Sequence, residues 1–149
     1  MQINIFTDGA CKGNPGPGGY GVILEYLHHR KEISCGFEKT TNNRMELMAV
    51  IVGLESLKNY NLPVHIYSDS KYVIDSISKG WVFTWLNKGF KGKKNEDLWR
   101  RYLELHNKFN LTFHWIKGHA GHPENERCDY LAIVAAEKGP WKKDEGFEK

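Results

Sequence analysis

The chain has 149 residues, of which 40% are hydrophobic and 26% charged, and its formal net charge is +3. This length suits one domain with a real buried core, and the composition is that of an ordinary soluble protein. No apolar stretch approaches membrane-spanning length, and the first ten residues lack the basic-then-apolar pattern of a leader. We therefore expect a cytoplasmic protein with no membrane partner.

The first half of the chain is predicted to carry three strands and then a helix. Five glycines and two prolines between residues 12 and 21 favour a turn or loop there. Met45 and Met48 lie at helical spacing, and a preceding asparagine can cap that helix. The expected elements are a strand at 2–7, a loop at 12–21, paired strands at 20–27 and 32–38, and a helix from Asn42 or Asn43 to about residue 59.

The second half alternates strands with helices, which together with the first half predicts an α/β fold. We expect a mixed sheet with helices on both faces, in one domain spanning residues 1–149. The expected elements are strands at 64–68 and 111–116, helices at 70–78, 81–86, 96–109 and 123–137, loops at 87–95 and 117–122, and a loose tail at 138–149.

Four carboxylates stand where a carboxylate is costly. Asp8 and Asp69 each follow an apolar strand, and ligand sites form beyond the carboxyl ends of parallel strands. Glu46 and Asp129 share helix faces with small and apolar residues, so both helices are expected to rest on the sheet there. Each acid alone could be a turn cap or a first-turn acid. Together, the four favour a shared site for divalent cations.

A basic and aromatic segment spans residues 79–101. It holds seven Lys or Arg residues against two acids, and it also carries three Trp and two Phe residues. Basic side chains interleaved with aromatic ones suit a polyanion with stackable faces. The alternative is a solvated charged face above a small aromatic cluster.

Four sequence runs resemble bacterial type 1 ribonuclease H, and they occur in that family's order. These are FTDGACKGNPGPGGYG at 6–21, TTNNRMELMAVIVGLE at 40–55, SDSKYV at 68–73 and WIKGHAGHPENERCDYLA at 115–132. The resemblance implies a ribonuclease H-like fold with a five-stranded mixed sheet. It also implies hydrolysis of the RNA strand of RNA–DNA hybrids, which leaves 5′-phosphate and 3′-hydroxyl ends.

The same resemblance assigns catalytic roles to five residues. Asp8 would bridge two Mg²⁺ ions, with Mn²⁺ as a substitute, and Asp129 would complete the ion that activates water. Glu46 and Asp69 would hold the ion near the leaving oxygen. His119 would relay a proton or help product release. The alternative for His119 is an ordinary exposed loop histidine.

The resemblance also implies contacts to the hybrid, with little preference for base sequence. The contacts expected on the shallow groove, chiefly to the RNA strand, are Cys11, Asn14, Asn42 and Asn43, with Lys71 at a position where relatives often carry another polar residue. A DNA phosphate is expected at Thr41 with Asn14 and Lys39. The DNA strand is expected to meet Trp81, Lys88, Lys91, Lys93 and Lys94 of the basic protrusion at 79–101.

Two departures and two alternatives accompany this hypothesis. The segment after Trp85 is shorter and less basic than the family's usual protrusion, which bears on affinity and salt response. No separate hybrid-binding module precedes the catalytic domain, so processive binding is not expected. The chain is also expected to be a monomer without an obligate protein partner. The alternatives are a related polynucleotidyl transferase or junction resolvase, against which His119 and the Asn42–Asn43 pair argue, and a non-catalytic hybrid-binding module, which would lack an acid.

Overall fold

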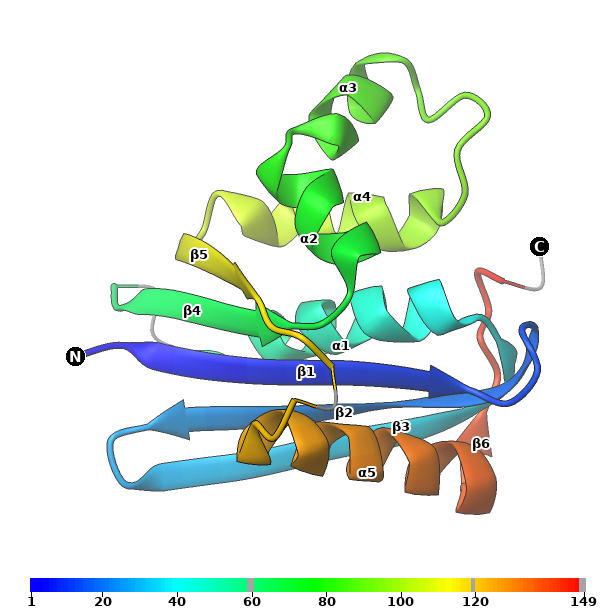
Figure 1. The fold of residues 1–149 in the computed structure, drawn as a ribbon. Helices are drawn as coiled ribbons and strands as arrows, with labels where there is room; N and C mark the ends of the chain where they lie inside the picture. The colour runs from blue at the N-terminus through cyan, green and yellow to red at the C-terminus, as the bar shows by residue number, and fades with distance from the viewer. Residues whose placement is uncertain (59–60, 119, 148–149) are drawn as a thin grey trace.

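The computed structural model describes residues 1–58, 61–118 and 120–147. These residues form one mixed sheet with helices on both faces (Figure 1). The strands are β1 (Ile3–Cys11), β2 (Gly16–Tyr26), β3 (His29–Thr40), β4 (Pro63–Ser68), β5 (Asn110–Trp115) and β6 (Trp141–Lys142). The helices are α1 (Asn42–Glu55), α2 (Lys71–Ser78), α3 (Trp81–Asn87), α4 (Glu96–His106) and α5 (Pro123–Lys138).

The sheet has the strand order β5-β4-β1-β2-β3-β6. β2 runs antiparallel to both β1 and β3, whereas β4 is parallel to both β1 and β5. The predicted α/β class is confirmed, but the expected count of five strands is wrong, because β6 adds a sixth, parallel to β3. A two-residue strand that follows a helix carries too little sequence pattern to be recognised.

The glycine-rich run is mostly strand rather than loop. β2 begins at Gly16, so the expected loop at 12–21 is wrong in its second half. α5 packs so close to this strand that a Cβ at Gly19 would lie 2.8 Å from the Cβ of Ala135. A Cβ at Gly21 would lie 2.8 Å from the Cβ of Leu131. These glycines therefore serve close packing between helix and sheet.

α1 covers the opposite face of the sheet from α5 (Figure 1). The predicted buried face of α1 is present, since Ala49, Val50 and Gly53 are all buried. A Cβ at Gly53 would lie 3.0 Å from Ile5 Cγ2, so the helix rests directly on β1. Its packing against the strands and α4 forms the main apolar core, which fully buries Ile5, Val22, Leu54, Ile66, Trp99 and Tyr102.

The helix ends differ from the sequence predictions by a few residues. Thr41, not an asparagine, caps α1, and its hydroxyl accepts a hydrogen bond from the Arg44 N–H at 3.3 Å. α1 ends at Glu55, and the predicted end at residue 59 lies outside the described residues. Within the described ranges, no helix combines the length and the apolar character needed to cross a membrane.

The C-terminal segment makes specific contacts with the rest of the fold, so the expectation of a loose tail is wrong for residues 138–147. β6 pairs with Gly36 and Phe37 of β3. Beyond it, the Asp144 side chain is 3% exposed and accepts a hydrogen bond from Arg44 Nε at 2.7 Å. The Thr40 hydroxyl also donates to Asp144 at 2.7 Å. Local sequence pattern gives no sign of an ion pair between residues so far apart in the chain.

Candidate active site and nucleic-acid interface

Asp8 lies near the end of β1, where the start of α1 crosses the strand. The next residue is Gly9, and a Cβ there would lie 2.8 Å from the Cβ of Met45. The missing side chain lets the first turn of α1 approach the strand, which brings Glu46 beside Asp8. Both carboxylates are buried, with 4% and 5% exposure.

Asp69 directly follows β4, the strand parallel to β1 (Figure 1). Its backbone carbonyl accepts a hydrogen bond from the Trp115 indole at 3.1 Å, which ties it to the end of β5. The loop after β5 also closes on Asp69, because a Cβ at Gly118 would lie 2.6 Å from Asp69 Oδ2. The position of Asp69 is thus set by the strand that it follows and by the end of β5 with its loop.

Three of the four predicted carboxylates converge. One carboxylate oxygen from each of Asp8, Glu46 and Asp69 lies within 4.8 Å of the others. Asp129 on α5 stands outside this group of three, but its charge acts on Asp8 and raises the pKa of that carboxyl. The fourth acid therefore lies at the edge of the cluster.

The electrostatics of this carboxylate cluster favour a bound cation. Burial raises the pKa of Asp8 to about 8, and the charge of Asp69 acts in the same direction. Burial also raises the pKa of Glu46 well above its usual range, again with help from its two neighbours. Glu46 Oε1 is enclosed and has no hydrogen-bond partner within the described part of the chain. Repelling oxygen ligands with one unpartnered oxygen fit a hard divalent cation.

The predicted proton-handling residue, His119, lies outside the described residues. The structure describes its neighbour Gly118, which packs against Asp69 as stated above. The role of His119 therefore stays a prediction.

A groove of about 860 Å³ brings several of the predicted substrate residues together. Asn14, Thr41 and Asn43 lie along it on the side of α1, and Lys93 and Lys94 lie along it on the side of the basic protrusion. Amide and hydroxyl groups thus face two cations across one channel. This arrangement suits a ligand that presents sugars on one side and phosphates on the other.

Two other predicted contacts lie next to this groove. The Asn42 N–H donates to Asn14 Oδ1 at 3.0 Å, which joins the 12–15 turn to the start of α1. The Cys11 sulfur lies 3.4 Å from the Thr40 carbonyl oxygen and 3.2 Å from that of Gly13. The turn, the end of β1 and the start of α1 therefore form one connected polar surface.

The remaining predicted contacts do not line the groove. Lys39, Lys88 and Lys91 are exposed elsewhere, and Trp81 is 44% exposed in α3. Lys71 places its ammonium 4.7 Å from the centre of the Trp115 ring, close to Asp69. Their proposed contacts to nucleic acid stay predictions.

The sequence model of the family described as RNase H matches residues 1–137. The chain belongs to the ribonuclease H family. It is therefore a nuclease of the hydrolase class. Ribonuclease H of Desulforamulus reducens is 56% identical over 142 residues, which cover 92% of this chain and 89% of that relative. Ribonuclease H of Escherichia coli O127:H6 is 50% identical over 152 residues, covering 99% and 96%.

Solved structures of the ribonuclease H family share this fold. LC9-RNase H1, described as a type 1 RNase H with the type 2 active-site motif, matches with a TM-score of 0.80. It is 32% identical, and the match covers 91% of this chain and 72% of that one. LC11-RNase H1 in complex with an RNA/DNA hybrid matches with a TM-score of 0.68 and 27% identity, covering 92% and 98%.

Three residues at the ribonuclease H site were not predicted from the sequence. Arg44 and Asn95 line the groove between α1 and the basic protrusion. Asn95 has a left-handed backbone with φ of 67°, and its amide donates to the Tyr72 hydroxyl at 3.0 Å. Its position as an asparagine immediately before a predicted helix could have singled out Asn95 in the sequence. Trp115 belongs to one of the four family-like sequence runs but was given no role of its own. An aromatic residue at the end of a predicted strand could have indicated a contact with the site.

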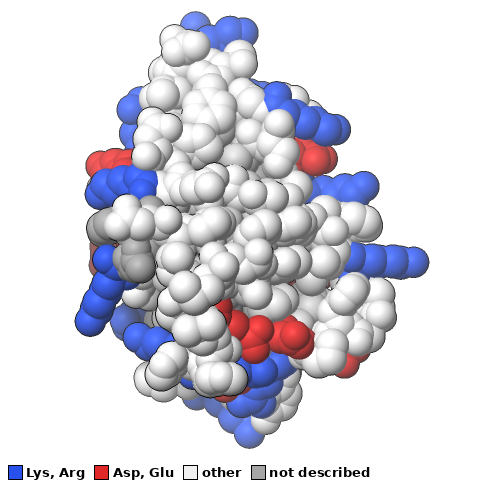
Figure 2. All heavy atoms as spheres, turned by 90° about the vertical axis from the view of Figure 1, so that its left-hand side faces the viewer, with Lys and Arg blue, Asp and Glu red and all other residues white. Residues whose placement is uncertain are grey.

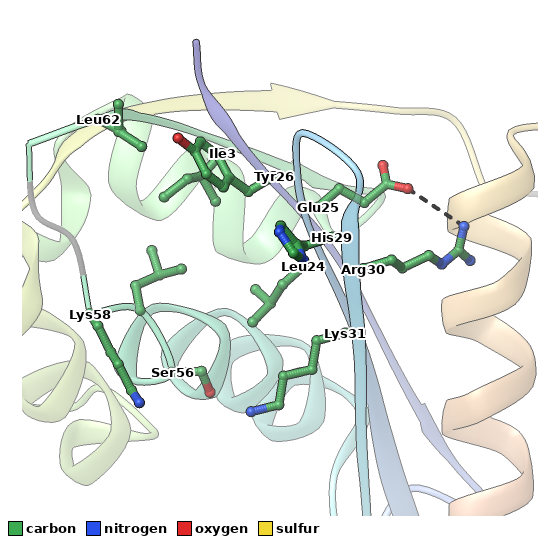
Figure 3. Close-up of a pocket in the computed structure, with 11 residues that line it drawn as sticks. Ile3, Leu24, Glu25, Tyr26, His29, Arg30, Lys31, Ser56, Lys58 and Leu62 are labelled. Carbon is green, nitrogen blue, oxygen red and sulfur yellow. Dashed lines mark ion pairs between the residues drawn. The ribbon is translucent and has the colours of Figure 1, made fainter.

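A second hollow, of about 480 Å³, lies at the other end of the sheet, where β1 begins (Figure 3). Its lining is largely apolar with basic groups at the rim: Ile3, Leu24, Glu25, Tyr26, His29, Arg30, Lys31, Ser56, Leu57, Lys58 and Leu62. Figure 2 shows the face of the molecule on the left of Figure 1, where Lys and Arg lie mainly around the margin. None of the predicted site residues lines this hollow, so it is separate from the ribonuclease H site.

Proposed function

We propose that this protein hydrolyses the RNA strand of RNA–DNA hybrids by a two-metal-ion mechanism. The observation that carries the proposal is the mutual approach of Asp8, Glu46 and Asp69 to within 4.8 Å, in a site where burial and repulsion disfavour three bare negative charges. Family membership and the hybrid-bound relative LC11-RNase H1 support the choice of substrate.

The carboxylates are the ligands that we assign to the metal. Asp8 is influenced by the charges of both Asp69 and Asp129, so it is the residue best placed to serve two ions. Glu46 and Asp69 would hold the ion near the leaving 3′-oxygen, and Asp129 would complete the ion near the attacking water. Oxygen ligands of this kind suit Mg²⁺, with Mn²⁺ as a substitute.

When bound by these carboxylates, divalent ions would supply an activated water and would neutralise charge at the phosphorus and at the leaving oxygen. Around them, the chain orients the phosphate and handles protons. We assign the proton relay, or assistance in product release, to His119 on the loop after β5. The products would carry 5′-phosphate and 3′-hydroxyl ends.

The residues on the two sides of the groove support the proposed contacts with the RNA and DNA strands. Polar groups of Asn14, Thr41 and Asn43 can contact sugar and phosphate groups, including the 2′-hydroxyl that distinguishes RNA from DNA. Lys93 and Lys94 on the opposite side would neutralise phosphates of the DNA strand. Trp81, Lys88 and Lys91 would extend that contact along the basic protrusion. The proposed working form is a cytoplasmic monomer, one domain in size, without an obligate protein partner.

Gel analysis of end-labelled nucleic acids tests this function. With Mg²⁺ or Mn²⁺ we expect cleavage of the RNA strand in a hybrid, with RNA duplex and DNA duplex of the same sequence left intact. Chelation by EDTA should stop the reaction. Cleavage of duplex DNA, or joining of strands, would instead indicate a transferase or resolvase of the same fold.

A matched pair of variants ties the cleavage to the carboxylate cluster. Glu46→Gln removes one charge from the cluster, whereas Glu55→Gln removes one charge from the exposed end of the same helix. Only Glu46→Gln should abolish cleavage. Equal loss in both variants would contradict the site assignment.

A further inference from the structure

Arg44 joins three segments that are distant in sequence. Its side chain is 3% exposed and lies on α1, two residues before Glu46. Nε and Nη2 donate to Asp144 of the C-terminal segment at 2.7 and 2.8 Å. Nη1 and Nη2 donate to Asp97 at the start of α4 at 2.9 and 2.7 Å. We call this set of Arg44, Asp97 and Asp144 the arginine clamp.

The arginine clamp lies within the groove proposed to hold the hybrid. Arg44 and Asp97 both line it, and Gly146 and Phe147 of the C-terminal segment line it as well. One side of the groove is the start of α1, which carries Arg44 and is capped by Thr41. The other side carries Lys93 and Lys94, which shortly precede the first turn of α4, where Asp97 lies. Both sides are therefore attached to the same guanidinium group.

A guanidinium is well suited to fix such a spacing. It is planar, it stays charged, and it can make paired hydrogen bonds with two carboxylates at once. The Thr40 hydroxyl further holds Asp144 at 2.7 Å, so the second carboxylate has little freedom to turn. Without Asp144, Arg44 would keep its pairing to Asp97 but lose the partner that sets its own orientation.

We propose that Asp97 and Asp144 are positioning residues for hybrid binding. Through Arg44 they set the distance between the start of α1 and the two lysines opposite, so that one duplex meets both sides of the groove. This inference rests on the proposed function, and it gives the C-terminal segment a role in substrate binding.

The loss of negative charge and the loss of the positioning contact predict opposite changes in hybrid affinity, so substitutions at Asp97 and Asp144 can distinguish them. Asp97→Asn and Asp144→Asn each remove a negative charge beside a polyanion, so electrostatics alone predicts tighter hybrid binding. Loss of the arginine clamp predicts weaker binding. We expect the KM for hybrid to rise about threefold to tenfold, the range of indirect couplings, with little change in kcat. Fluorescence anisotropy in EDTA should show the same loss of affinity in the absence of cleavage.

Glu55→Gln is the matched control. Glu55 also joins α1 to α4, through Arg101 Nε at 2.8 Å, but this ion pair is exposed and does not line the groove. The substitution removes the same charge and also breaks a contact between α1 and α4. It should leave KM for hybrid unchanged. An equal rise in KM would overturn the proposal, since loosening of α1 against α4 would then suffice.

The outcomes separate this inference from the proposed function. Wild-type cleavage of hybrid, with KM unchanged in Asp97→Asn and Asp144→Asn, overturns the positioning role alone. Wild-type protein that neither binds nor cleaves hybrid overturns both proposals. If Asp144→Asn does not fold, Asp97→Asn decides, because its side chain is 44% exposed and tolerates the change.

Discussion

The carboxylate cluster and the arginine clamp each include a buried charged residue from the same turn of α1. They differ in whether that charge is surrounded by like or by opposite charges. Glu46 meets Asp8 and Asp69, so like charges are gathered together, and none of the three forms an ion pair with another described residue. Arg44, two residues earlier, meets carboxylates at hydrogen-bond distance on both sides. Each cluster therefore has a buried charge at its centre, Glu46 in one and Arg44 in the other, and the balance of charge distinguishes a ligand site from a structural link between segments.

The pKa directions express the same contrast. Burial by itself lowers the pKa of Arg44, but its hydrogen bonds to Asp97 and Asp144 raise it above its usual value. The pKa of Asp8 rises because burial and the charge of Asp69 act in the same direction. The ion pair of Arg44 and Asp97 thus keeps its charges in the folded protein, whereas Asp8 and Glu46 are stabilised by protons or by a bound cation.

Asp8→Asn should have the largest effect on function. We expect cleavage to fall by about a thousandfold or more, which corresponds to roughly 4 kcal/mol of lost transition-state stabilisation. Single-turnover cleavage of a hybrid measures it. Asp75→Asn is the control, because Asp75 lies on α2 in an ion pair with Lys79 and outside the carboxylate cluster. Cleavage retained in Asp8→Asn would remove this residue from the metal site.

The stability of the two clusters should respond with opposite signs. Arg44→Met leaves Asp144 buried without its cation, so the free energy of unfolding should fall by about 3–5 kcal/mol. Glu46→Gln relieves repulsion, so the free energy of unfolding should rise in EDTA. Urea denaturation followed by circular dichroism measures both values. A loss of stability in Glu46→Gln would show that its charge is already compensated.

The pH dependence of stability should also separate the clusters. Asp8 has a folded pKa of about 8, far above its ordinary value, so the stability it contributes is present at low pH and is lost as pH rises toward 8. Burial acts to raise the pKa of Asp97, but hydrogen bonds from Arg44 outweigh it and lower that pKa. The contribution of Asp97 is therefore lost as pH falls through the acid range.

Thermal unfolding in EDTA between pH 4 and 8 tests these opposite signs. Asp8→Asn should flatten the decline in melting temperature toward pH 8. Mg²⁺ should restore stability most strongly at the alkaline end, because the ion competes with the proton for the same oxygens. A wild-type melting temperature that rises steadily toward pH 8 in EDTA would contradict the raised pKa of Asp8.

The smallest expected effect concerns the groove lysines. Replacing Lys93 and Lys94 by Gln should reduce the slope of log affinity against log salt by about 1.8, since each phosphate that a lysine neutralises adds roughly 0.9 to that slope. The pair Lys88→Gln and Lys91→Gln removes equal charge from the proposed extension of that contact, outside the groove, and should change the slope less. Equal changes in both pairs would contradict the larger contribution assigned to the groove lysines.

The sequence was most informative where local pattern and chemistry coincide. Asp8 and Asp69 were placed by the ends of apolar strands, and Glu46 by its helix face. The arginine clamp was beyond reach, because Arg44 and Asp144 are far apart in the chain and no local period marks them. The strand at Gly16 was mistaken for loop because glycine signals a turn by itself, whereas here the reason is the helix that packs on it.

The glycines beneath α5 have a consequence for how tolerance to substitution would be interpreted. Gly19 and Gly21 carry no reactive group, yet any larger residue would push α5 outward and carry Asp129 with it. A mutational survey that measures only enzymatic activity would find Gly19 and Gly21 as essential as the catalytic acids. The position of an acid on this helix therefore depends on the absence of side-chain atoms beneath it.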